Sequence, residues 1–173
     1  MKGFLRQFFW AVLLVLVQIF VVNGLQLRGA MGTLVVPSIW FFYILIMPLQ
    51  TSRLSLLLVS FAMGIVVDSF FSTLGVNAAA GVLVGYLRPF LLPLFISGEW
   101  KEKKTSPSIY TMGIRYFFYY VILLSFLFHF LQFFLEVFSF NEWYFTLLRI
   151  LLSSIASAVL MMLFQFLFAK KNH

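Results

Sequence analysis

The 173-residue chain contains no cysteine, and only 10% of its residues carry a charge. The missing cysteines exclude a disulfide framework, a thiol nucleophile and a cysteine metal site. The scarcity of charge excludes a soluble globular domain, in which about a quarter of the residues are charged. Because 63% of the residues are hydrophobic and the mean hydropathy is +1.05, too few polar side chains remain to coat a surface in water. The sequence predicts an integral membrane protein with a single domain over residues 1–173.

Long apolar runs alternate with short breaks along the chain. A membrane helix needs about 20 mostly apolar residues. The expected spans are 8–25, 34–50, 54–73, 76–96, 116–138 and 146–168. The first has the basic start of a signal peptide, but its apolar stretch is long enough to cross, so we interpret it as a retained helix. The second contains Pro37 and Pro48. A full span is expected there, with a tilted or re-entrant segment as the alternative.

Basic residues gather on one side of this predicted topology. With the N-terminus in the cytoplasm, these residues lie on the cytoplasmic side: Lys2, Arg6, Arg53, Lys101, Lys103, Lys104, Arg115, Lys170 and Lys171. The outer connection between the last two spans carries Glu136 and Glu142 instead. This positive-inside pattern predicts an all-α bundle of about six helices with both termini in the cytoplasm. It also makes the net charge of +7 a topology signal and not a nucleic-acid footprint. The cytoplasmic loop 97–115 is either solvated or in contact with anionic lipid or a partner.

Asp68 is the only aspartate, and it lies inside an apolar run. Small and polar residues recur at every fourth position around it and beyond the next turn: Ser60, Gly64, Asp68 and Ser72, then Asn77, Gly81 and Gly85. The two rows are expected to face each other with closely packed backbones, Asp68 level with Gly81 or Val82. Gly75 is expected in a left-handed turn, and Asn77 is expected to cap the next helix. Asp68 either accepts hydrogen bonds and locks this helical hairpin to a neighbour, or contacts a partner, a substrate or an ion.

Two arginines also fall within apolar spans. Arg149 begins the last span at a depth similar to that of Asp68, and we predict an ion pair between them. Arg88 is expected to extend its guanidinium to the cytoplasmic surface, with a docking surface as the alternative. Pro89 and Pro93 are expected to kink or loosen the same helix.

The chain offers little material for catalysis. Polar residues on one face of span 116–138 and in the first span are interpreted as interhelical hydrogen-bonding groups: Ser125, His129, Gln132 and Glu136, then Gln18 and Asn23. The chain has one aspartate, no Gly-x-Ser-x-Gly sequence and no phosphate-binding glycine loop. We therefore predict no enzyme activity, no cofactor and no metal site.

The helical hairpin resembles the bacterial rod shape-determining protein MreD family. That family has a glycine-rich span with a single aspartate, a short Leu-Gly turn, and then a His or Asn followed by small residues. The matching residues are Gly64, Asp68, Leu74, Gly75, Asn77 and Ala78. A proline often precedes the Leu-Gly pair in the family, whereas this chain has Thr73. Elsewhere the agreement is in length, hydropathy and basic cytoplasmic ends.

The resemblance implies a non-catalytic inner-membrane subunit of the machinery that elongates rod-shaped bacteria. Its expected partners are an MreC-like protein, an MreB-type filament, a SEDS glycosyltransferase and a class B penicillin-binding protein. The family is similar in fold to the substrate-binding subunits (S-components) of energy-coupling-factor vitamin transporters, so an S-component-like bundle is expected. The alternative function is therefore a solute-binding transporter subunit, with an outward-facing site lined by Asp68, Asn77, Arg149 and Glu136. The very short outer loops favour the first function.

Overall fold

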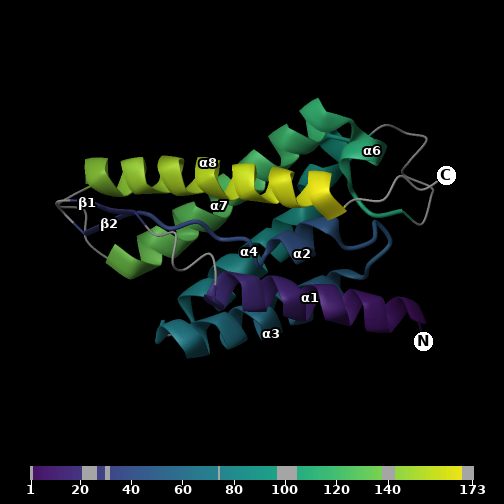
Figure 1. Cartoon of the computed structure of the whole chain (residues 1–173), viewed down its shortest axis with the longest axis horizontal. Coiled ribbons are helices and arrows are strands. Elements are labelled where there is room, and N and C mark those ends of the chain that lie inside the picture. Colours follow the sequence, from purple (N-terminus) through teal and green to yellow (C-terminus); the bar gives the residue numbers. More distant parts are fainter. Residues whose placement is uncertain are drawn as a thin grey trace.

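The protein is described from a computed structural model, which describes residues 2–20, 27–29, 32–73, 75–96, 105–137 and 143–168. In chain order the elements are α1 (Lys2–Phe20), β1 (Leu27–Gly29), β2 (Gly32–Val35), α2 (Phe42–Ile46), α3 (Arg53–Phe71), α4 (Val76–Leu91), the 3₁₀ turn η2 (Leu92–Leu94), α6 (Ile109–Met112), α7 (Ile114–Val137) and α8 (Trp143–Phe168). The helices form an elongated bundle (Figure 1). The strands mark one end, here named the strand end, and α6 marks the other, the α6 end. The start of α1 and the end of α8 both lie toward the α6 end.

Among the described residues, four helical segments are long and apolar enough to cross a membrane: Arg53–Phe71, Val76–Leu94, Ile114–Glu136 and Trp143–Phe168. They correspond to the last four predicted spans. The apolar part of α1, Phe9–Phe20, is shorter than a span, and residues 21–25 of the first predicted span lie outside the described residues, as does Asn23. A helical protein with several membrane-length helices is confirmed, and the described residues contain four such helices where the sequence predicted six spans.

The predicted span 34–50 is not a helix. The chain leaves β2 at Val35, continues without helix to residue 41, forms the five-residue helix α2, and ends in turns before α3. The two prolines explain this conformation. Pro37 restrains the preceding residue to an extended backbone, and Pro48 does the same to Met47, whose ψ of 149° ends α2. The prediction of a full helical span is therefore wrong. Residues 34–50 form an irregular segment that contains only the short helix α2.

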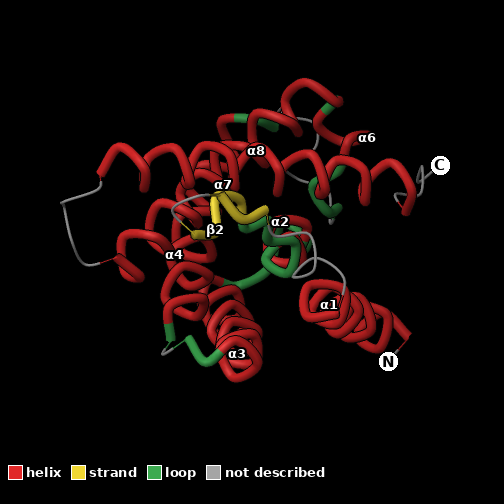
Figure 2. Tube along the Cα trace, turned by 60° about the vertical axis from the view of Figure 1, so that its left-hand side comes forward, coloured by secondary structure: helices red, strands yellow, loops and turns green. Residues whose placement is uncertain are grey.

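The hydrophobic core is centred on this irregular segment. Five of its side chains are completely buried: Trp40, Phe41, Phe42, Ile44 and Leu45. The Phe41 ring stacks on that of Phe128 in α7, with 4.2 Å between centroids. Figure 2 shows α2 in the middle of the bundle with the long helices around it. Large apolar side chains are exposed mainly on the outer faces of those helices, as on α8 at Ile155 and Leu163.

A short two-stranded sheet caps the strand end, where the sequence predicted only helices. The strands β1 and β2 pair antiparallel, with Arg28 opposite Thr33 and Gly29 opposite Gly32. The strand β2 also packs against α8. The sheet therefore ties the start of the irregular segment to the last helix.

The helical hairpin of α3 and α4 has the tight turn that the sequence predicted. Ser72 ends α3 with a left-handed backbone (φ 55°), and Gly75 precedes α4 with φ 80°. Gly75 thus has the predicted left-handed conformation. Ser72 does not contribute to hairpin packing, because it is exposed at the helix end. At the other end, α4 changes into the 3₁₀ turn η2 beyond Pro89, the loosening expected from its prolines.

Glycines hold α3 and α4 in close contact. A Cβ atom built on Gly64 would lie 2.7 Å from the backbone nitrogen of Ala78, so the two backbones nearly touch there. A Cβ on Gly81 would lie 2.6 Å from the ring of Trp40, and one on Gly85 would lie 2.5 Å from the hydroxyl of Ser60. The spacing predicted from the turn is wrong, because Gly81 lies opposite the backbone of Ser60 and not opposite Asp68.

Candidate functional site

Asp68 caps the following helix from across the turn. Its Oδ1 atom accepts hydrogen bonds from the backbone N–H of Asn77 (3.0 Å), from the Asn77 side-chain amide (3.0 Å) and from the Thr73 hydroxyl. Its Oδ2 atom accepts from the backbone N–H of Ala78 (2.9 Å). Gly75, the residue before α4, has no side chain to cap it, and Asp68 takes that role. A carboxylate is also favoured next to a helix N-terminus, where the helix dipole is positive.

This geometry corrects the expected role of Asn77. Asn77 is the second residue of α4 and does not cap the helix. Its side-chain amide donates to Asp68 and to the Thr73 hydroxyl (3.1 Å). Asp68 is only 5% exposed and receives four hydrogen bonds from its own hairpin. Hydrogen bonds were expected to lock the hairpin to a neighbour, but the bonds to Asp68 lie within the hairpin and join α3 to α4.

The predicted ion pair between Asp68 and Arg149 is wrong. Arg149 pairs with Glu136 on the neighbouring helix α7, with 3.6 Å between Nη2 and Oε2. Its guanidinium carbon also lies 4.3 Å from the ring centroid of Phe133. The physical reason is that both oxygens of Asp68 are occupied by donors of the hairpin. The buried Nε of Arg149 has no hydrogen-bond partner among the described residues.

A polar cavity of about 370 Å³ lies beside the hairpin turn. It is lined by Gln18, Val36, Ser38, Val67, Phe71, Thr73, Asn77, Gln132, Glu136 and Arg149. Three of the four residues predicted to line a solute site thus meet at one cavity. Asp68 is not in the wall, but it holds Thr73 and Asn77, which are. The lining offers one charge of each sign together with amides and two hydroxyls, a set that suits a small polar molecule.

Two glutamines in this wall were predicted only as interhelical hydrogen-bonding groups. Gln18 reaches the irregular segment, donating to the carbonyl of Pro37 (3.2 Å) and accepting from the N–H of Ile39 (2.7 Å). The Oε1 atom of Gln132 lies 3.0 Å from Nδ1 of His129. Their position in apolar helices was the available signal. It could not show that both face one cavity, since that depends on how α1 and α7 are placed.

Serines of α8 satisfy the extended part of the irregular segment. The backbone N–H of Val36 donates to the hydroxyl of Ser153 (3.0 Å), and that of Ser38 donates to the hydroxyl of Ser157 (2.8 Å). His129 of α7 lies 2.8 Å from the same Ser157 hydroxyl, in the interhelical role predicted for it. Non-helical backbone at membrane depth must find such partners inside the protein.

Arg88 does not extend to the surface as predicted. It is 1% exposed, and its side chain caps the C-terminal end of α2. Its Nε donates to the carbonyl of Leu45 (3.3 Å), and its Nη2 donates to the carbonyl of Met47. The hydroxyl of Tyr120 donates to the same Leu45 carbonyl (3.1 Å). The prediction failed because α2 and the unpaired carbonyls at its end were not foreseen.

Neither a metal site nor a known relative adds to this geometry. Within the described ranges, no group of three or more His, Asp or Glu side chains is placed to hold a metal ion. No protein-family model, no curated protein and no solved structure matches the chain.

Proposed function

We propose that this protein is a non-catalytic, multi-pass subunit of the bacterial inner membrane that helps maintain rod shape. The observation that carries the proposal is that the residues of the MreD-like motif contact one another within the hairpin. Asp68 binds the amides of Asn77 and Ala78, Gly64 lies against Ala78, and Gly75 supplies the left-handed turn. Each of these residues has a structural role within the hairpin. A motif of this kind suits a rigid scaffold.

In this role the protein would present the hairpin and its outer helix faces to neighbours in the membrane. Both termini would lie in the cytoplasm, on the side of an MreB-type filament. An MreC-like protein, a SEDS glycosyltransferase and a class B penicillin-binding protein would bind laterally. The exposed apolar side chains of α3, among them Leu58, Phe61 and Phe70, provide surface for such contacts. Neither a cofactor nor a nucleic acid is needed for this function.

Depletion of the protein in a rod-shaped host tests the proposal. We expect the cells to become round and a plasmid copy to restore their shape. Asp68→Ala and Gly81→Leu should insert in the membrane at normal levels and still lose co-purification with an MreC-like partner. Ser69→Ala is the matched control, because Ser69 is exposed next to Asp68 and its hydroxyl donates to the carbonyl of Ile65 in the same helix. Cells that keep their rod shape after depletion would contradict the proposal.

The polar cavity favours a second candidate, a substrate-binding subunit of a small-molecule transporter. Its volume of about 370 Å³ lies in the range of small-molecule sites. Arg149 and Glu136 would hold the charged groups of the solute, and Asn77 would donate to it. For this candidate, depletion should leave the shape intact and reduce uptake of one vitamin-sized solute. Arg149→Gln should reproduce the uptake defect, whereas in the shape-determining role it should not change cell shape.

A further inference from the structure

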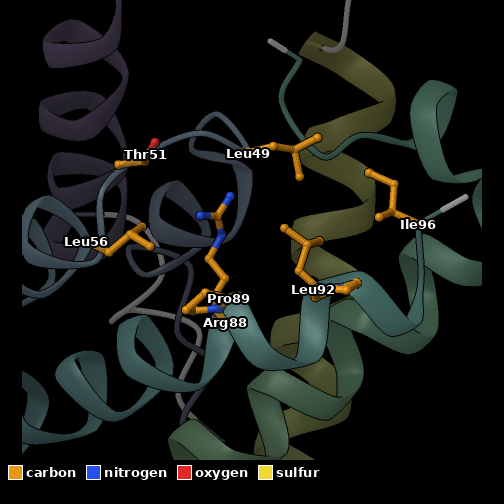
Figure 3. Close-up of a pocket in the computed structure, with 8 residues that line it drawn as sticks. Leu49, Thr51, Leu56, Arg88, Pro89, Leu92 and Ile96 are labelled. Carbon is orange, nitrogen blue, oxygen red and sulfur yellow. The ribbon is translucent and has the colours of Figure 1, made fainter. Parts of the chain in front are cut away.

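A second cavity, of about 260 Å³, lies around Arg88, and its lining shares no residue with that of the polar cavity. Figure 3 shows the Arg88 side chain extending from α4 toward the segment of Leu49 and Thr51. Leu56 lies on one side of this side chain, and Leu92 and Ile96 lie on the other. Apart from Arg88 and Thr51, the side chains in the wall are apolar. The cavity is therefore an apolar pocket with one positively charged side chain, Arg88, in its wall.

The charge of Arg88 is not balanced by the described part of the chain. A guanidinium stays charged in proteins, and Arg88 is 1% exposed. Its two hydrogen-bond acceptors, the carbonyls of Leu45 and Met47, carry no formal charge. Among the described residues, Arg88 forms no ion pair with an acidic side chain. Since burying an uncompensated charge is costly, an anion beside the guanidinium would stabilise the fold.

A second source of positive potential points to the same space. Thr51 and Leu56 line the cavity, and they flank the first turn of α3. The Ser52 hydroxyl caps that turn by accepting from the N–H of Ser55 (3.1 Å). The N-terminus of a 19-residue helix attracts anions through its dipole and its unpaired N–H groups. Arg88 and the start of α3 therefore face the cavity from two sides.

We propose that this cavity binds an oxyanion of the phosphate class against Arg88. Arginine matches the planar spacing of phosphate oxygens and binds them with charge-assisted hydrogen bonds. Inorganic phosphate and the phosphodiester of an anionic phospholipid share this chemistry. A phospholipid would also fill the apolar part of the wall at Leu92 and Ile96. The proposal does not depend on the proposed function, because both candidate functions leave Arg88 unused.

The test uses the full-length protein, purified in neutral detergent and stripped of lipid. Its melting temperature and its bound mass in native mass spectrometry are followed during titration with three probes: inorganic phosphate, phosphatidylglycerol, and diacylglycerol, which lacks phosphate. We expect binding of phosphatidylglycerol, of inorganic phosphate or of both, and none of diacylglycerol. A response to phosphatidylglycerol alone identifies a lipid, and an equal response to inorganic phosphate identifies the free anion. Failure of both phosphate probes would overturn the proposal.

Variants assign the binding to the cavity. Arg88→Gln should weaken binding by about tenfold or more, since a charge-assisted hydrogen bond is lost. Arg53→Gln is the control, because Arg53 is exposed at the same end of α3 and lies over the ring of Phe90 (5.0 Å). Ile96→Trp leaves Arg88 in place but fills the cavity with the larger side chain, and it should therefore abolish binding of the phosphate probes. Unchanged affinity in folded Arg88→Gln or Ile96→Trp protein, or equal binding of diacylglycerol, would overturn the proposal.

Discussion

Asp68 and Arg88 are both buried charged residues in neighbouring apolar helices, but their charges are compensated in different ways. Asp68 accepts four hydrogen bonds from donors of its own hairpin. Arg88 donates to two carbonyls of the irregular segment, and no described acid pairs with it. The first charge is compensated locally and the second is compensated only by dipoles. Each of these two buried charges caps a helix end: Asp68 caps the start of α4, and Arg88 caps the end of α2.

The two sites differ in how far along the chain their partners lie. Asp68 binds residues 9 and 10 positions away, whereas Arg88 binds residues 43 and 41 positions away. A local site depends on the turn between two consecutive helices. A long-range site depends on the packing of the whole bundle. Substitutions at the two sites should therefore differ in how much they lower the free energy of unfolding and in whether their effects are additive.

The largest effect is expected for Asp68→Ala. This variant leaves the N–H groups of Asn77 and Ala78 buried without an acceptor and should lower the free energy of unfolding by about 3 kcal/mol. Asp68→Asn keeps one acceptor oxygen and should lose about half as much. Thermal unfolding in detergent measures both, with Ser69→Ala as the control. Equal melting temperatures for Asp68→Ala and the control would mean that the hairpin does not depend on this cap.

Gly64→Ala comes next, because it tests whether close backbone contact supports the Asp68 site. Its Cβ would meet the backbone of Ala78, which cannot move without separating α3 from α4. We expect a loss of about 2 kcal/mol, typical of overpacking. Ile65→Ala, on the exposed side of the same helix, is the control. If Gly64→Ala melts like Ile65→Ala, the two helices have room to separate.

The smallest effect is expected for Tyr120→Phe, because Arg88 still donates to the shared carbonyl of Leu45. Alone it should cost roughly 0.5 kcal/mol, at the low end for a hydrogen bond. In an Arg88→Met background, which removes the second donor, the cost should rise to about 1 kcal/mol or more, because the carbonyl then has neither donor. A double-mutant cycle on melting curves measures the coupling, with the exposed Tyr116→Phe as control. Additive effects would show that the two donors act independently.

The predictions from sequence held for the long helices and for the turn between α3 and α4, although the level of Asp68 and the capping role of Asn77 within that hairpin were predicted wrongly. Hydropathy placed the four membrane-length helices, and the glycine at the hairpin turn predicted its left-handed backbone. They failed where a helix meets a distant segment. The pairing of Arg149 with Glu136 rests on the contact between α7 and α8 and on the saturation of Asp68 by its own hairpin. Neither of these could be read from spacing along the chain.

Composition and pattern by themselves determined that this chain is a helical protein with membrane-length helices and that α3 and α4 form a tight pair. These features depend on hydrophobicity and on neighbours a few residues apart. Only the tertiary structure decided that residues 34–50 pass through the core without a membrane-length helix, although Pro37 and Pro48 pointed to an interruption. The physical reason is that such a segment needs partners for its backbone, and these come from Gln18, Ser157 and Arg88 on three other helices. Their polar atoms have a role only once the bundle has assembled.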